Sequence, residues 1–123
     1  MTQAIILFAH GARDPEWAQP FERLRDALRA RSPGAVVELA YLELMQPDLA
    51  TAVDALAARG VTAISVAPVF MAQGGHLKRD LPQRVEAVRA KHAGLRITLQ
   101  PAVGEAQAVI DAMASHIAAR AES

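Results

Sequence analysis

The chain has 123 residues, a length typical of one domain, so we expect residues 1–123 to form a single domain. Its 13 basic and 13 acidic side chains cancel, and this balance gives no overall electrostatic signal for nucleic acid or an anionic membrane. The absence of cysteine excludes disulfides, thiolate metal sites and cysteine nucleophiles. Any bound metal ion must therefore be held by histidine, carboxylate or backbone oxygen.

No apolar run approaches the roughly 20 residues that a membrane span requires. The first residues lead directly into a strand-like segment and do not have the pattern of a signal peptide. We therefore expect a cytoplasmic protein with no membrane partner and no nucleic-acid partner.

Strand-like and helix-like segments alternate along the chain. Residues 4–9 form a short apolar run, as expected for a strand that is covered on both faces. Trp17, Phe21, Leu24 and Leu28 recur at spacings of three and four, which predicts an amphipathic helix over residues 16–31. The same reasoning predicts strands at 36–42, 61–67 and 95–99, and helices from Gln46-Pro47-Asp48 to Gly60, from about 77 to 92, and over 105–120.

This alternation predicts an α/β fold. Strands joined by helical crossovers pair in parallel, and the right-handedness of the crossovers places helices on both faces of the sheet. We therefore expect a three-layer α/β/α domain with a four-stranded parallel sheet in the order 2-1-3-4, a short flavodoxin-like arrangement. In such a sheet, ligands bind beyond the carboxyl ends of the strands, at the point between the first and third strands where the connections diverge.

Two histidines follow the two strands that flank this point. His10 ends the first strand, and His76 lies in the glycine-containing loop after the third. Although they are far apart in sequence, the topology makes them neighbours, with Glu43 after the second strand extending the same crevice. One imidazole binds a divalent cation or accepts a proton near neutral pH, so this pair suits metal handling or proton transfer.

The surroundings of His76 fit a ligand-binding loop. Gly74 and Gly75 are expected to let the backbone approach a ligand, because glycine has no side chain and reaches unusual dihedral angles. The N-terminal end of the following helix disfavours imidazolium, so we expect His76 to be neutral and able to bind metal. The candidate partners for ligand carboxylates are Arg13, Lys78 and Arg79.

Three segments together resemble the small sirohydrochlorin chelatases of the class II tetrapyrrole chelatases. They are His-Gly-Ala-Arg-Asp-Pro at 10–15, Tyr-Leu-Glu-Leu-Met-Gln-Pro at 41–47, and Pro-Val-Phe-Met-Ala-Gln-Gly-Gly-His-Leu-Lys-Arg-Asp-Leu-Pro at 68–82. The resemblance covers almost the whole chain and implies a chelatase fold. It also implies ATP-independent insertion of Co²⁺, Fe²⁺ or Ni²⁺ into sirohydrochlorin for cobalamin or sirohaem, with no organic cofactor, by a homodimer.

The resemblance also implies roles for individual residues. His10 and His76 match metal-binding histidines, and His10 matches the proton acceptor. Glu43 matches an acidic position, which we count with His10 as catalytic, and Gln46 matches a substrate contact. Ala12 departs from the serine of many relatives, and Gln46 replaces an acidic residue found in a number of them. The loop that matches the cradle of the tetrapyrrole consists of Met71, Ala72, Gln73, Gly74 and Gly75.

Three other functions fit parts of the pattern. A non-catalytic metal or tetrapyrrole carrier would use the same histidines. A histidine phosphatase would use the pair His10-Gly11, but that chemistry usually needs an arginine before the histidine, where this chain has Ala9. A flavodoxin-like signalling module would need a phosphate-accepting aspartate after a strand, and none of the first three predicted strands ends with one.

Overall fold

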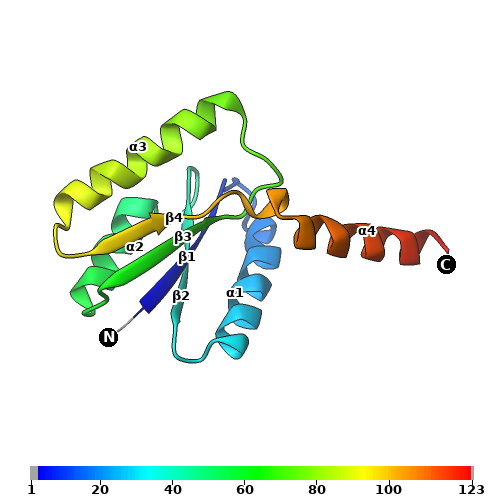
Figure 1. The fold of residues 1–123 in the computed structure, drawn as a ribbon, viewed down its shortest axis with the longest axis horizontal. Helices are drawn as coiled ribbons and strands as arrows, with labels where there is room; N and C mark the ends of the chain where they lie inside the picture. The colour runs from blue at the N-terminus through cyan, green and yellow to red at the C-terminus, as the bar shows by residue number, and fades with distance from the viewer. Residues whose placement is uncertain (1–2, 123) are drawn as a thin grey trace.

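The strands form one parallel sheet at the centre of the molecule (Figure 1). The computed structural model describes residues 3–122. The predicted order is confirmed, because the strands are arranged β2-β1-β3-β4 with every neighbouring pair parallel. Predicted strand ends lie within two residues of the observed ones. The strands are β1 (Gln3–Ala9), β2 (Val36–Tyr41), β3 (Ala63–Pro68) and β4 (Arg96–Leu99).

Each strand is followed by a helical segment. The predicted helix over 16–31 begins with a separate 3-10 turn, where the Asp14 carboxylate accepts a hydrogen bond of 2.9 Å from the Glu16 amide. The last helix is likewise preceded by a short 3-10 turn. The segments are η1 (Pro15–Ala18), α1 (Gln19–Arg31), α2 (Leu49–Ala58), α3 (Gly75–Lys91), η2 (Val103–Glu105) and α4 (Gln107–Ala121).

The two faces of the sheet carry separate hydrophobic clusters. Helices α2 and α3 cover one face and α1 covers the other (Figure 1). Side chains alternate along the central strand β1, so Ile6 and Phe8 pack under α2 and α3 while Leu7 and Ala9 pack under α1. This double coverage explains why β1 is a continuous apolar run and not an alternating one.

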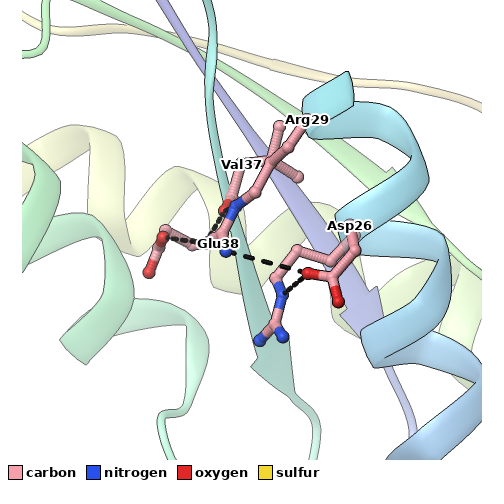
Figure 2. A network of polar contacts seen from close by, with 5 residues as sticks. Asp26, Arg29, Val37 and Glu38 are labelled. Carbon is pink, nitrogen blue, oxygen red and sulfur yellow. Dashed lines mark hydrogen bonds and ion pairs between the residues drawn. The ribbon is translucent and has the colours of Figure 1, made fainter. Parts of the chain in front are cut away.

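Arginines link the helices to the two edge strands. Figure 2 shows Arg29 of α1, whose guanidinium donates hydrogen bonds of 3.1 and 2.7 Å to the Val37 carbonyl and pairs with Glu38 at 2.8 Å. Arg89 of α3 donates bonds of 3.0 and 2.7 Å to the Ile97 carbonyl of β4 in the same way. Each arginine lies eight residues before its acceptor, so the same kind of hydrogen bond links a helix to each edge strand of the sheet.

Helix α4 departs from the expected layering. It projects away from the sheet, and none of its described residues is buried (Figure 1). The face of β3 and β4 on the side of α1 presents Ser65, Thr98 and, just after β4, Gln100, whose side-chain amide donates a hydrogen bond of 2.6 Å to the Ser65 hydroxyl. A polar face offers an apolar helix little surface to bury, so α4 gains little from lying there. No helix in the described part of the chain is long and apolar enough to cross a membrane.

The cap of α2 provides a test of the local structure. The Asp48 carboxylate accepts a hydrogen bond of 2.9 Å from the Thr51 amide, and this bond is the largest cause of the lowered pKa of Asp48. Asp48→Ala should lower the free energy of unfolding by about 1 kcal/mol at pH 7, measured by urea denaturation. Asp48→Asn should lose less, because an asparagine oxygen also caps helices.

The pH dependence has a definite sign. Because the folded-state pKa lies below the unfolded value near 3.8, the stabilisation is complete above that pH and is lost as pH falls through the folded pKa. The difference in the free energy of unfolding between wild type and Asp48→Asn should therefore disappear in strong acid. Equal urea midpoints for wild type and Asp48→Ala at pH 7 would show that the cap contributes nothing.

Candidate functional site

A pocket of about 500 Å³ opens where the carboxyl ends of the strands meet α3. Its wall combines the segment after β1, the segment after β2 and the start of α3, which are distant in sequence. It therefore brings His10 and His76 to one cavity, together with Glu43. The lining residues are His10, Leu42, Glu43, Ala72, Gly74, His76, Leu77, Asp80 and Arg84.

His10 is held by its ring and by its backbone. Its imidazole lies against the buried ring of Phe70, with ring centroids 4.3 Å apart and planes inclined by 36°. Its carbonyl accepts a hydrogen bond of 3.0 Å from the Glu43 amide, while the Ala9 carbonyl accepts one of 2.8 Å from the Leu42 amide. The β1–β2 pairing thus continues past both strands and places Glu43 beside His10.

Gly11 makes this close approach possible. Its φ is +90°, and a Cβ built there would lie 1.8 Å from the Glu43 carbonyl oxygen. Only a residue without a side chain fits, since the Glu43 backbone occupies the space that a side chain would need. The glycine after His10 therefore serves the packing of two loops against each other.

A tight turn after β2 presents Glu43. Leu44 has a φ of +67°, which is unusual for a residue with a branched side chain, and the Met45 amide donates a hydrogen bond of 2.8 Å to the Glu43 carbonyl. The turn reverses the chain immediately after Glu43. The exposed Glu43 side chain lines the pocket, while the residues that follow lie on the side of α1.

His76 is the second residue of α3, and the backbone before it is ordinary. Gly74 precedes the helix with φ −69° and ψ 165°, and Gly75 is not among the residues of positive φ. The expectation of unusual dihedral angles at these glycines is therefore wrong. A Cβ at either position would meet no atom within 4 Å, so what the two glycines leave there is open space.

Several residues expected at the site lie elsewhere. Arg13 and Gln46 line a different hollow of about 360 Å³ on the side of α1, next to Tyr41. Burial raises the pKa of Tyr41, and the charge of Glu22 adds to this effect. Gln46 lies there because it follows the reversal at Leu44. Of the cradle loop, Ala72 and Gly74 line the histidine pocket; Met71, Gln73 and Gly75 line neither hollow, and Met71 is 66% exposed.

Sequence reasoning gave two of the lining residues no role in the site, although one of them, Asp80, lies within the segment at 68–82. Asp80 and Arg84 follow His76 along α3 at intervals of four, and the Arg84 Nε lies 2.6 Å from Asp80 Oδ2. The helical spacing from His76 was a readable signal, because residues four apart share one face of a helix. Lys78 and Arg79, which the sequence analysis singled out, are exposed and do not line the pocket.

Gly104 supports the loop before α3. Its amide donates a hydrogen bond of 2.8 Å to the Phe70 carbonyl, and a Cβ at this buried glycine would lie 2.3 Å from the Met71 Cα. The 3-10 turn η2 therefore packs directly against the backbone of the segment that follows β3. Sequence reasoning missed Gly104, because only the fold brings it next to Met71.

The acidic and imidazole groups of the pocket do not form a compact cluster. Within residues 3–122, no group of three or more His, Asp and Glu side chains is arranged to hold a metal ion. His10, Glu43 and His76 are instead distributed around the cavity wall, where each can act on a ligand placed between them.

The glycines provide a test of how the site is built. Gly11→Ala should destabilise the protein by more than about 1 kcal/mol, because it adds a left-handed backbone penalty to a clash with Glu43. Gly74→Ala is the matched control and should have no such cost, since space is open and φ is negative. Thermal unfolding of both variants measures the difference, and equal melting temperatures would contradict the proposed packing.

Comparison with known proteins gives consistent matches over this chain. The family model named CbiX matches residues 4–120. A sirohydrochlorin ferrochelatase of Bacillus subtilis (strain 168) is 28% identical over 113 residues, covering 92% of this chain and 43% of the relative. A sirohydrochlorin cobaltochelatase of Sulfurisphaera tokodaii is 31% identical over 100 residues, covering 81% of this chain and 78% of the relative.

A solved structure extends the likeness to nearly the whole fold. The crystal structure of a putative cobalamin (vitamin B12) biosynthesis CbiX protein from Marinobacter aquaeolei VT8 is 32% identical, with a TM-score of 0.87. The match covers 98% of each chain. In contrast, this chain spans less than half the length of the Bacillus subtilis ferrochelatase.

Proposed function

Because the chain belongs to the CbiX family, we propose that it inserts a divalent metal ion, cobalt or iron, into sirohydrochlorin. The relatives support this reaction, since one is a ferrochelatase and another a cobaltochelatase, both of sirohydrochlorin. The observation that carries the proposal is the pair His10 and His76 on the wall of one pocket, with Glu43 beside them. We further propose that residues 1–123 act as one chelatase domain.

The reaction requires both a metal carrier and a proton acceptor. Two pyrrole N–H bonds of the macrocycle break, both protons leave, and four nitrogens bind the incoming cation. Neutral imidazole suits Co²⁺, Fe²⁺ and Ni²⁺ as a ligand, and imidazole also accepts protons near neutral pH. We assign His10 and His76 to delivery of the metal substrate, and His10 with Glu43 to removal of the protons.

The surroundings of each group suit its assigned part. The ring of Phe70 restrains the plane of the His10 imidazole, which favours a fixed approach to the centre of a flat substrate. Glu43 is held by backbone hydrogen bonds while its side chain stays exposed, so it can pass a proton on to water. His76 lines the same pocket from the first turn of α3. We also propose that Ni²⁺ is accepted as a metal substrate and that the reaction requires no organic cofactor.

We also propose that the active form is a homodimer. Helix α4 bears an apolar stripe, in which Ile110 is 41% and Ile117 is 65% exposed, with Val109 and Met113 half-buried on the same side. Beside the N-terminal end of α4 lies a mostly apolar hollow of about 450 Å³, whose lining includes Pro101, Ala102 and Val103. A second copy of this chain can cover both the stripe and the hollow. Two copies together are also comparable in length to the ferrochelatase, of which one copy matches 43%.

Metal insertion tests the assignment of the histidines. With purified protein, sirohydrochlorin and Co²⁺, Fe²⁺ or Ni²⁺ in turn, His10→Ala and His76→Ala should each lower kcat/KM by at least about 100-fold. Glu43→Gln should lose less, because a histidine remains to accept protons. His92→Ala is the matched control, since His92 lies outside the pocket, paired with Asp54 at 2.7 Å. The absorbance change on metallation measures each rate.

Two outcomes would contradict these assignments. Insertion by wild type no faster than the protein-free reaction would reject an enzyme and leave a carrier that uses the same histidines. Wild-type rates in both histidine variants, with unchanged circular dichroism, would show that the reaction occurs elsewhere on the protein.

The oligomeric state tests the role of α4. Light scattering should give a molar mass twice the 13.1 kDa of one chain. Ile117→Glu should produce monomers, because it places a charge in the apolar stripe that the second copy would bury. Ser115→Glu, which adds the same charge to the opposite side of α4, should remain dimeric. A monomeric wild type, or equal behaviour of the two variants, would exclude this interface.

A further inference from the structure

We propose that Arg84 forms a carboxylate-binding subsite at the edge of the histidine pocket, where it engages a peripheral carboxylate of the macrocycle. This inference rests on the proposed function, because it takes sirohydrochlorin as the ligand of the pocket. It adds a residue that lies just after the third conspicuous segment of the sequence (68–82), on the third turn of α3.

His76, Asp80 and Arg84 occupy successive turns on one side of α3, and all three line the same cavity. Eight residues of helix separate His76 from Arg84, which corresponds to about 12 Å along the axis. A tetrapyrrole carries its nitrogens at the centre and its carboxylates on side chains at the periphery. A ridge with an imidazole at one end and a guanidinium at the other therefore offers partners for both kinds of group.

Among the described residues that line this pocket, Arg84 is the one lysine or arginine, while Glu43 and Asp80 are acidic. A substrate rich in carboxylates would meet repulsion there without a cation. Arg84 supplies that cation and suits the task, because a guanidinium donates two parallel hydrogen bonds to one carboxylate.

Asp80 binds the Nε of Arg84 at 2.6 Å, and the described contacts of Arg84 do not involve its two terminal nitrogens. One edge of the guanidinium is thus held while the terminal nitrogens remain able to donate. The Arg84 side chain is 46% exposed, so binding a carboxylate requires only partial further desolvation.

An exposed pair four residues apart also has a purely structural explanation, since such pairs stabilise helices slightly. That explanation predicts equal effects from removing either partner. The subsite predicts unequal losses of ligand affinity, because Arg84 contacts the ligand while Asp80 only orients the Arg84 side chain. Removing Asp80 also removes a negative charge that repels the substrate. The two explanations therefore differ in ligand affinity and not only in stability.

The experiment compares Arg84→Gln with Arg79→Gln, which has the same charge change on the same helix but lies outside the pocket lining. The dissociation constant of metal-free sirohydrochlorin is measured by titration, and KM and kcat by Co²⁺ insertion. Arg84→Gln should raise the dissociation constant and KM about tenfold with kcat within about twofold, as expected for loss of one charge-assisted hydrogen-bonded contact. Arg84→Lys should recover part of the loss, and Arg79→Gln should match wild type.

The outcomes separate this inference from the proposed function. A wild type that binds sirohydrochlorin but inserts no metal would overturn the function, while the dissociation constants would still decide the role of Arg84. Equal affinities for wild type and Arg84→Gln would overturn the subsite and leave the function intact. Equal losses of affinity in Arg84→Gln and Asp80→Asn would favour the structural pair and also overturn it. Absence of sirohydrochlorin binding by wild type would overturn both.

Discussion

The arrangement of the site depends on the parallel pairing of β1 with strands on both of its sides. This pairing continues beyond the strands, because the Leu42 amide bonds to Ala9, the Glu43 amide to His10 and the Val69 amide to Phe8. Backbone hydrogen bonds of this kind leave little freedom in where a loop begins. The segments after β1, β2 and β3 therefore start side by side, and the chemical groups that they carry share one end of the sheet.

The second constraint is close contact between the backbones of separate loops. Glycines make this contact possible without having to bind a ligand themselves. Gly11 allows the loop after β1 to lie against Glu43, and Gly104 allows η2 to lie against Met71. These two contacts determine where Glu43 and the segment before α3 are placed. By comparison, Gly74 and Gly75, which look like the functional glycines, have room for a side chain in this structure. A glycine beside a candidate catalytic residue can thus serve the scaffold.

The two faces of the sheet differ in how completely they are covered. On one face, α2 and α3 pack over the larger cluster, which includes Ile64, Leu81 and Val85. On the other, α1 covers β1 and β2, while α4 leaves the body of the molecule (Figure 1). The close match to the Marinobacter aquaeolei structure over 98% of the chain is consistent with this placement of α4. The exposed apolar stripe on this outlying helix is the observation behind the proposed homodimer.

The sequence by itself predicted the strand order and the two histidines that share the pocket, because both predictions start from local patterns and general rules of parallel sheets. Apolar runs and helical spacing are properties of neighbouring residues, the right-handedness of crossovers is a general rule for parallel strands, and His10 and His76 follow two of the strands or their loops. Only the tertiary structure decided the rest of the pocket. The left-handed turn at Leu44 takes Gln46 to another hollow, which Arg13 also lines, helix α3 brings in Asp80 and Arg84, and a polar sheet face leaves α4 outside. These outcomes depend on contacts between distant segments, whose energies cannot be read from the residues on either side.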